Sequence, residues 1–143
     1  MIIKQISVFL ENKQGRLAFI TEVLAKNNIN IRALSLADST DFGVLRLIVD
    51  DPLAAEQKLK GEGLTVSVTD VVSVAIDDRP GGLAKVLKTL DETNIGAEYV
   101  YAFVGSNENK AYVVLKVRDT ALAVKVLKEN GYNQQEKDEV YKI

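Results

Sequence analysis

The chain has 143 residues, a formal net charge of −2, and neither cysteine nor histidine. It therefore lacks a disulfide framework, a thiol nucleophile, and the side chain that most often serves as general base and metal ligand. Its Lys and Arg residues are scattered, which disfavours a nucleic-acid partner, and no apolar run approaches the roughly 20 residues that span a bilayer. With no secretory signal at the N-terminus, we expect a cytoplasmic protein with no cofactor, metal or membrane partner.

Hydrophobic periodicity divides the first half of the chain into six elements. Apolar residues alternate from Ile6 to Leu10, as in a strand, whereas Leu17, Ile20 and Leu24 form one stripe of a helix. The predicted order is a strand over 3–10, a helix over 16–27, strands over 29–37 and 44–49, a helix over 52–59 and a strand over 64–69.

The second half repeats this order. Its predicted elements are a strand over 71–77, a helix over 83–90, strands over 97–104 and 111–117, a helix over 120–130, and a short strand with a tail over 132–143. No Gly/Pro/Ser-rich linker separates the halves, because residues 64–76 are almost continuously strand-like. We therefore expect one unit over 1–69 and a second over 70–143, held rigidly together.

The two halves also repeat each other in sequence. Asn28 and Ile29 recur 66 positions later as Asn94 and Ile95. Gly15, Leu17, Ala18 and Leu24 recur at the same spacing, and beyond a longer middle turn at 105–110 seven residues between positions 47 and 63 recur at a spacing of 68. Such self-similarity marks two copies of one folding unit. The order β-α-β-β-α-β predicts an α+β fold of two tandem ferredoxin-like units with antiparallel sheets.

The turn between the first strand and first helix of each copy has the composition of a binding loop. Gly15, and Gly81 with Gly82, precede a helix, and glycine permits positive φ and close approach of another group. The free amides and partial positive charge of a helix N-terminus suit a carboxylate. Asn12 or Asp78, three residues before the glycine, is placed to hold an ammonium group. The loop thus fits a free α-amino acid, although a plain turn with local hydrogen bonds fits it as well.

The sequences of these two loops resemble the signature of a known protein family. Residues 12–17 (Asn-Lys-Gln-Gly-Arg-Leu) and 78–83 (Asp-Arg-Pro-Gly-Gly-Leu) resemble the (Asn/Asp)-x-Pro-Gly-x-Leu signature of ACT domains. ACT domains are the amino-acid-sensing modules of phosphoglycerate dehydrogenase, aspartokinase and similar enzymes. Residues 23–31 resemble the end of the family's first helix and the start of its second strand. The resemblance covers nearly the whole chain, as a stand-alone pair of ACT units.

The resemblance implies that the units pack side by side through their second strands. A ligand would then lie where the loop of one unit meets the second strand of the other. One pocket would combine Asn12, Gly15, Arg16 and Leu17 with Gly96 and Ala97, and the other would combine Asp78, Pro80, Gly81, Gly82 and Leu83 with Asn30 and Ile31. The first pocket departs from the family pattern at Gln14 and Gly96, so we expect at least one competent pocket, not necessarily two equal ones.

The function that follows is a sensor that binds a free amino acid and regulates a partner, such as a metabolic enzyme, without catalysis. The alternative is an oligomerisation or interaction module that binds no ligand. A small enzyme using Asp, Glu and Lys is disfavoured, because no convergent set of ionisable groups can be assembled. Val44 and Ile48, like Tyr112 and Val114, lie on a strand face opposite other apolar residues. Both faces need cover, so we expect a homodimer.

Three remaining features have simple interpretations. Tyr99, Tyr101 and Phe103 alternate on one strand face, as in RNA-recognition sheets, but the acidic balance favours an aromatic face buried against the sister unit or another subunit. The acidic turn at 38–41 lacks the spacing of a calcium loop and is expected to be a solvated hairpin. Residues 136–139 are expected to be a charged surface tail.

Overall fold

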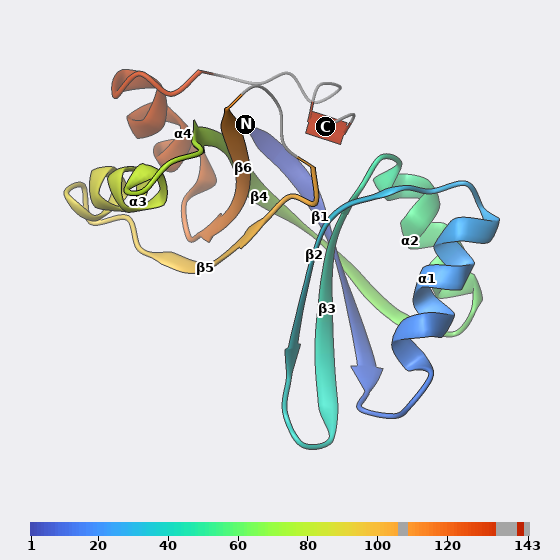
Figure 1. Ribbon diagram of the computed structural model, residues 1–143. Helices are drawn as coiled ribbons and strands as arrows, with labels where there is room; N and C mark the ends of the chain where they lie inside the picture. The colour runs from blue at the N-terminus through green and yellow to red at the C-terminus, as the bar shows by residue number, and fades with distance from the viewer. Residues whose placement is uncertain (106–108, 134–139, 142–143) are drawn as a thin grey trace. The chain divides into compact units, whose positions relative to one another are not determined.

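The computed structural model describes residues 1–105, 109–133 and 140–141. Its elements are β1 (Ile2–Glu11), α1 (Arg16–Lys26), β2 (Ile31–Asp38), β3 (Phe42–Val49), α2 (Pro52–Gly61), β4 (Thr65–Asp77), α3 (Gly82–Asp91), β5 (Ala97–Ala102), β6 (Lys110–Val117) and α4 (Thr120–Glu129). The predicted order is confirmed, and the strands predicted at 64–69 and 71–77 are the single strand β4 (Figure 1).

The prediction of a strand after α4 is wrong for the residues that the structure describes. Tyr132 and Asn133 are irregular, and Val140 and Tyr141 are helical. The predicted tail at 136–139 lies outside the described residues, as does part of the predicted turn at 105–110.

The chain divides into two compact units, which we call the first unit (residues 4–69) and the second unit (residues 1–3 with 70–143). Strands β1 and β4 each run through both. The strand order is β2-β3-β1-β4 in the first unit and β1-β4-β6-β5 in the second. Strand β3 is antiparallel to both β1 and β2, and β6 is antiparallel to both β4 and β5. Each unit therefore has the four-stranded antiparallel sheet of the ferredoxin-like fold, as predicted.

Each sheet packs its core against its own pair of helices. Figure 1 shows α1 and α2 on one side of β1, β2 and β3. In the first unit Leu45 and Leu47 of β3 pack with Leu24 of α1 and Leu59 of α2. The core of the second unit contains Val72, Val74, Leu115, Val86, Leu90 and Leu127. Leu47 and Leu115, which are matched by the repeat, are both fully buried.

The second unit is completed by the first three residues of the chain. Met1 is buried in the core of this unit, with Val72 and Val74 as neighbours. Its carbonyl oxygen accepts a hydrogen bond of 2.7 Å from the backbone N–H of Ser73. The start of β1 thus lies where the fourth strand was expected at the C-terminal end.

Both copies end their first helix in the same way. Asn28 and Asn94 have left-handed φ angles of 56° and 58°. The residues after them, Ile29 and Ile95, each donate a backbone hydrogen bond of 2.9 Å back to the helix. Asparagine tolerates this conformation better than most residues. The repeated Asn-Ile pair therefore ends the first helix of each copy in the same way.

The sheet face opposite the helices is buried in part within the single chain. Ile48 and Val114 are fully buried in the single chain, and Val44 and Tyr112 are half-buried. On the same face, however, Phe9, which pairs with Val44 across the sheet, is 47% exposed. The homodimer remains a prediction.

The aromatic residues of β5 and the segment after it are also covered. Tyr101 and Phe103 are buried. Tyr99 stacks on Tyr101 with ring centroids 6.3 Å apart, and Phe103 meets the ring of Tyr112 edge-on at 6.2 Å. These rings pack within the protein instead of presenting open faces to RNA bases.

None of the helices in the described parts of the chain is long and apolar enough to cross a membrane.

Candidate functional site

The two strand-to-helix loops have the same backbone geometry. Gly15 and Gly81 cap α1 and α3 with φ angles of 88° and 91°. Their carbonyl oxygens accept hydrogen bonds of 2.9 Å from the N–H groups of Phe19 and Lys85. Neither helix has a side-chain cap, and the first amides, those of Arg16 and Gly82, donate to the backbone oxygens of Lys13 at 3.3 Å and Arg79 at 3.0 Å. The predicted left-handed glycine is therefore present in both copies, each time before a helix that has no side-chain cap.

Asn12 holds the first loop against the β2–β3 hairpin. Its side-chain nitrogen donates to the backbone oxygens of Ser39 and Thr40, each at 3.3 Å. Its backbone N–H donates to the oxygen of Asp41 at 2.8 Å. The local hydrogen bonds of a structural turn are thus made here, and the side-chain oxygen of Asn12 is what remains to accept from an ammonium group.

The turn that Asn12 contacts is a hairpin, as predicted. The backbone N–H of Ser39 donates to the oxygen of Phe42 at 2.7 Å and closes the turn. Among the residues that the structure describes, no group of three or more acidic, histidine or cysteine side chains could hold a metal ion.

Asp78 occupies the matching place in the second loop, but its carboxylate has no partner among the residues that the structure describes. Its backbone N–H donates to the oxygen of Asn109 at 2.9 Å, as that of Asn12 does to Asp41. Its side chain is exposed and makes no hydrogen bond or ion pair with the described part of the chain. Beside it, Pro80 and Leu83 are also exposed, so this loop is accessible to solvent.

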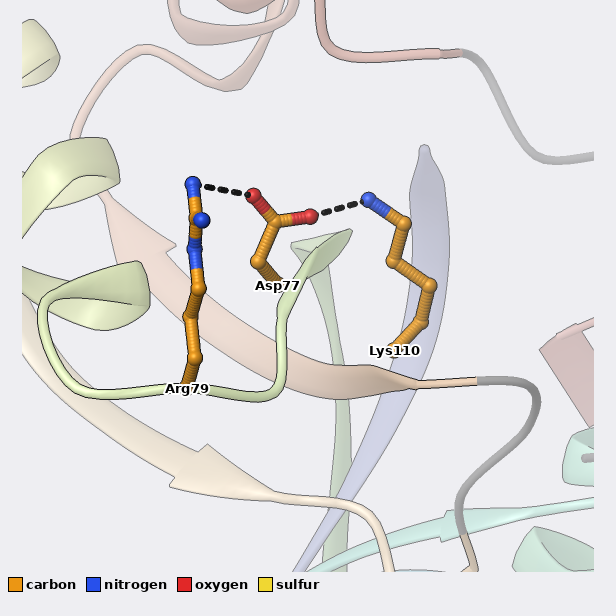
Figure 2. Close-up of polar contacts among 3 residues, drawn as sticks. All are labelled: Asp77, Arg79 and Lys110. Atoms are coloured by element: carbon orange, nitrogen blue, oxygen red, sulfur yellow. Dashed lines mark hydrogen bonds and ion pairs between the residues drawn. The ribbon is translucent and has the colours of Figure 1, made fainter.

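Strand ends supply charged groups that the sequence interpretation missed. Asp77, the last residue of β4, lies between Arg79 at 3.4 Å and Lys110 at 2.5 Å (Figure 2). The hydrogen bond and positive charge of Lys110, with a smaller contribution from Arg79, lower the pKa of the Asp77 carboxyl. Asp77 is the residue to which both basic side chains are anchored.

The first copy has the matching acid–base pair. Glu11 ends β1 and lies 2.6 Å from Lys13, which lowers the pKa of the Glu11 carboxyl through a hydrogen bond and through its charge. An acid that ends a strand and a base two residues later recur at the 66-residue spacing. That repeat was the available signal for this feature.

The remaining predicted residues belong to the start of the second strand of each unit. The backbone N–H of Asn30 donates to a carboxylate oxygen of Asp50 at 2.9 Å, and Ile31 is half-buried. Gly96 and Ala97 are exposed. Within the first unit, Asn12 lies at the hairpin end of β2, whereas Asn30 precedes its other end, so one unit alone does not bring them together. That a loop of one unit meets the second strand of the other stays a prediction.

The first unit contains a hollow of 630 Å³ beside its loop. Its walls come from the end of β1, the β2–β3 hairpin, Arg16 of α1 and residues 62–65. The lining includes Phe9, Phe42 and Val44 together with Glu11, Asp38, Ser39 and Glu62. A hollow of this size is within the range that holds small molecules.

The second unit has a matching but smaller hollow of 160 Å³. Its lining includes Ala75, Asp77, Gly82, Lys110 and Tyr132, which the repeat matches to Phe9, Glu11, Arg16, Phe42 and Leu64. Burial raises the pKa of the Tyr132 hydroxyl. This hollow is lined by charged and hydroxyl groups where the first has aromatic rings.

Comparison with known proteins agrees with this architecture. A family model described as an ACT domain pair matches residues 1–143. The solved structure of protein BT0572 from Bacteroides thetaiotaomicron is 44% identical, with a TM-score of 0.93 over 100% of this chain and 98% of that one. No match was found among curated proteins.

More distant structures share the fold. The regulatory subunit of aspartate kinase from Thermus thermophilus, in a ligand-free form, is 16% identical with a TM-score of 0.64, over 90% of this chain and 94% of that one. Aspartate kinase from Synechocystis is 18% identical with a TM-score of 0.57, over 93% of this chain and 27% of that one.

Proposed function

Because the chain belongs to the ACT domain pair family, we propose that it binds a free amino acid and passes the occupancy on to a partner protein. The observation that carries this proposal is the duplicated loop, in which a left-handed glycine opens an uncapped helix N-terminus in each copy. Amide donors and the helix dipole suit the carboxylate of the ligand.

The residues proposed to complete the site are those of the sequence prediction. The second loop is the stronger candidate, because the Asp78 carboxylate beside Gly81 is unpaired within the described part of the chain and can face the ligand's ammonium group. Asn30 is proposed as a polar partner from the start of β2. The regulated partner is proposed to be a metabolic enzyme, and a homodimer is the proposed assembly.

A thermal-shift screen of the purified protein against the twenty amino acids tests this function. A ligand at about 100 times its Kd stabilises the folded state by roughly 2.7 kcal/mol. For a chain of this size that raises Tm by several degrees. If no amino acid at millimolar concentration moves Tm, the protein is an interaction module without this ligand.

Calorimetry on two variants then tests the residues. Asp78→Ala and Asn30→Ala each remove a polar partner of the zwitterion, so affinity should fall by roughly 1–3 kcal/mol. Both residues are exposed, so Tm without ligand should change little. Full affinity in both variants would place the site elsewhere.

A further inference from the structure

The hollow of the first unit combines an apolar floor with charged walls. Phe9 and Phe42 are 47% and 65% exposed, so two aromatic rings stand largely open to solvent beside Val44. All lining residues lie between positions 9 and 65 and belong to this one unit. Open aromatic rings in a concave site gain free energy when an apolar group covers them.

The walls carry charges of both signs. Arg16 is half-buried at the start of α1, and its guanidinium makes no hydrogen bond with the described residues. Asp38 and Glu62 lie on the rim with exposed side chains. Glu11 is already held by Lys13. One cation and two available carboxylates around an apolar floor match a zwitterion that carries an apolar side chain.

The matched hollow of the second unit also has charged walls, formed by Asp77, Lys85 and Lys110, but it differs at three positions. Ala75 replaces Phe9, Lys110 replaces Phe42 and Gly82 replaces Arg16. Lys110 is held by Asp77 beside the place where the first unit offers an aromatic ring. The second hollow therefore has neither the aromatic floor nor the guanidinium.

We propose that the hollow of the first unit binds an amino acid with a large apolar side chain. The side chain covers Phe9 and Phe42, the carboxylate pairs with Arg16, and the ammonium group faces Asp38 and Glu62. The equivalent hollow of the second unit does not bind this ligand. This inference rests on the proposed sensor function and names its ligand class and one of its sites.

Calorimetry with phenylalanine and leucine as probes, and with alanine and glutamate as controls, tests the ligand class. The wild-type protein should bind phenylalanine or leucine at least about tenfold more tightly than alanine, because the apolar floor distinguishes them by the size of the side chain. Equal affinity for alanine and phenylalanine would overturn the proposal.

Variants that install the second unit's residues test the site. Phe42→Lys and Phe9→Ala should each weaken phenylalanine or leucine binding about tenfold or more. Arg16→Met, which keeps an unbranched side chain but removes the guanidinium and its charge, should do the same. Lys110→Phe is the control at the matched position of the second unit and should leave the affinity unchanged.

These variants change exposed or half-exposed residues, and Tm without ligand checks that each one folds. Affinity that survives Phe42→Lys and Phe9→Ala but is lost in Asp78→Ala would overturn the hollow and leave the sensor function standing. If no amino acid binds the wild-type protein, both proposals fail. Light scattering tests whether a second copy of the chain covers the hollow instead. If Phe42→Lys changes the mass of the particle in solution and leaves the affinity for the amino acid unaltered, the ligand site is overturned.

Discussion

The strand-to-helix loops of the two units share a backbone and differ in their side chains. Gly15 and Gly81 have nearly identical φ angles, and each strand-end acid, Glu11 or Asp77, holds the base two residues later. Around this frame one unit has an aromatic hollow and the other an ion cluster. Duplication thus kept what the backbone needs and left the surrounding side chains to diverge.

The first residue of each helix shows that the backbone limits which side chains can differ between the two copies. A Cβ atom at Gly82 would lie 2.1 Å from the carbonyl oxygen of Asp77, a distance that real contacts do not reach. The matched residue of the first unit is Arg16, which carries a long side chain at the same helical position. The second loop therefore turns more tightly against its strand, and only glycine fits there.

The largest expected effects test whether the two cores are equal. Leu47→Ala and Leu115→Ala each remove a fully buried side chain at a matched position, and each should lower the free energy of unfolding by about 2–5 kcal/mol. Urea denaturation measures both. Because β1 and β4 run through both units, we expect a single transition in each variant. A separate early transition in either one would show that its unit unfolds alone.

The next comparison concerns the helix starts. Gly82→Ala should destabilise the protein by about 1–3 kcal/mol, because the added methyl group must displace backbone. Arg16→Ala, its matched control, should change stability by no more than about 0.5 kcal/mol. Equal costs in urea denaturation would mean that the two loops do not differ as described.

The second helix of each unit supplies a case in which the copies should agree. The side chains of Asp51 and Asp119 accept hydrogen bonds of 3.1 and 3.0 Å from the backbone N–H groups of Ala54 and Leu122. Replacing either aspartate by alanine should cost about 0.5–2 kcal/mol. Thermal denaturation of the two variants should give similar values, and a clear inequality would show that the caps differ in their surroundings.

The smallest expected effect is on titration. Lys110→Met should raise the pKa of Asp77 towards its ordinary value of 3.8, because the largest cause of the lowered value is removed. In the wild-type protein this pair contributes stability above pH 3.8 that is lost as the pH falls through the lowered pKa. Carboxyl NMR titration measures the shift. A pKa of Asp77 that stays low would assign the effect to Arg79.

The sequence predicted the backbone features of the site better than its walls. Gly15, Gly81 and the Asn-Ile helix stops follow from local chemistry, which repeats with the sequence. Phe42 and Lys110 were missed because each faces a strand-end acid across the sheet, Glu11 or Asp77. Such pairs depend on strand register, which spacing along the chain does not give.

The fourth strand of the second unit shows the same limit over a longer distance. The similarity of the two halves placed it after α4, where the second copy should end. The structure instead uses residues 1–3, whose partner in the sheet, Ser73, lies 72 positions along the chain. No local pattern reports such a pairing.

The use of residues 1–3 as a strand of the second unit has a consequence for folding during synthesis. During synthesis, residues 1–3 are made before the first unit, whereas their hydrogen-bonding partner around Ser73 emerges only after the whole first unit has been made. Until then this short segment presents unpaired backbone groups, and a fragment that starts at residue 70 would lack it altogether. The sheet of the second unit can therefore form completely only when residues 1–3 and the strand around Ser73 are both available. Until then, residues 1–3 of the nascent chain have no strand to pair with.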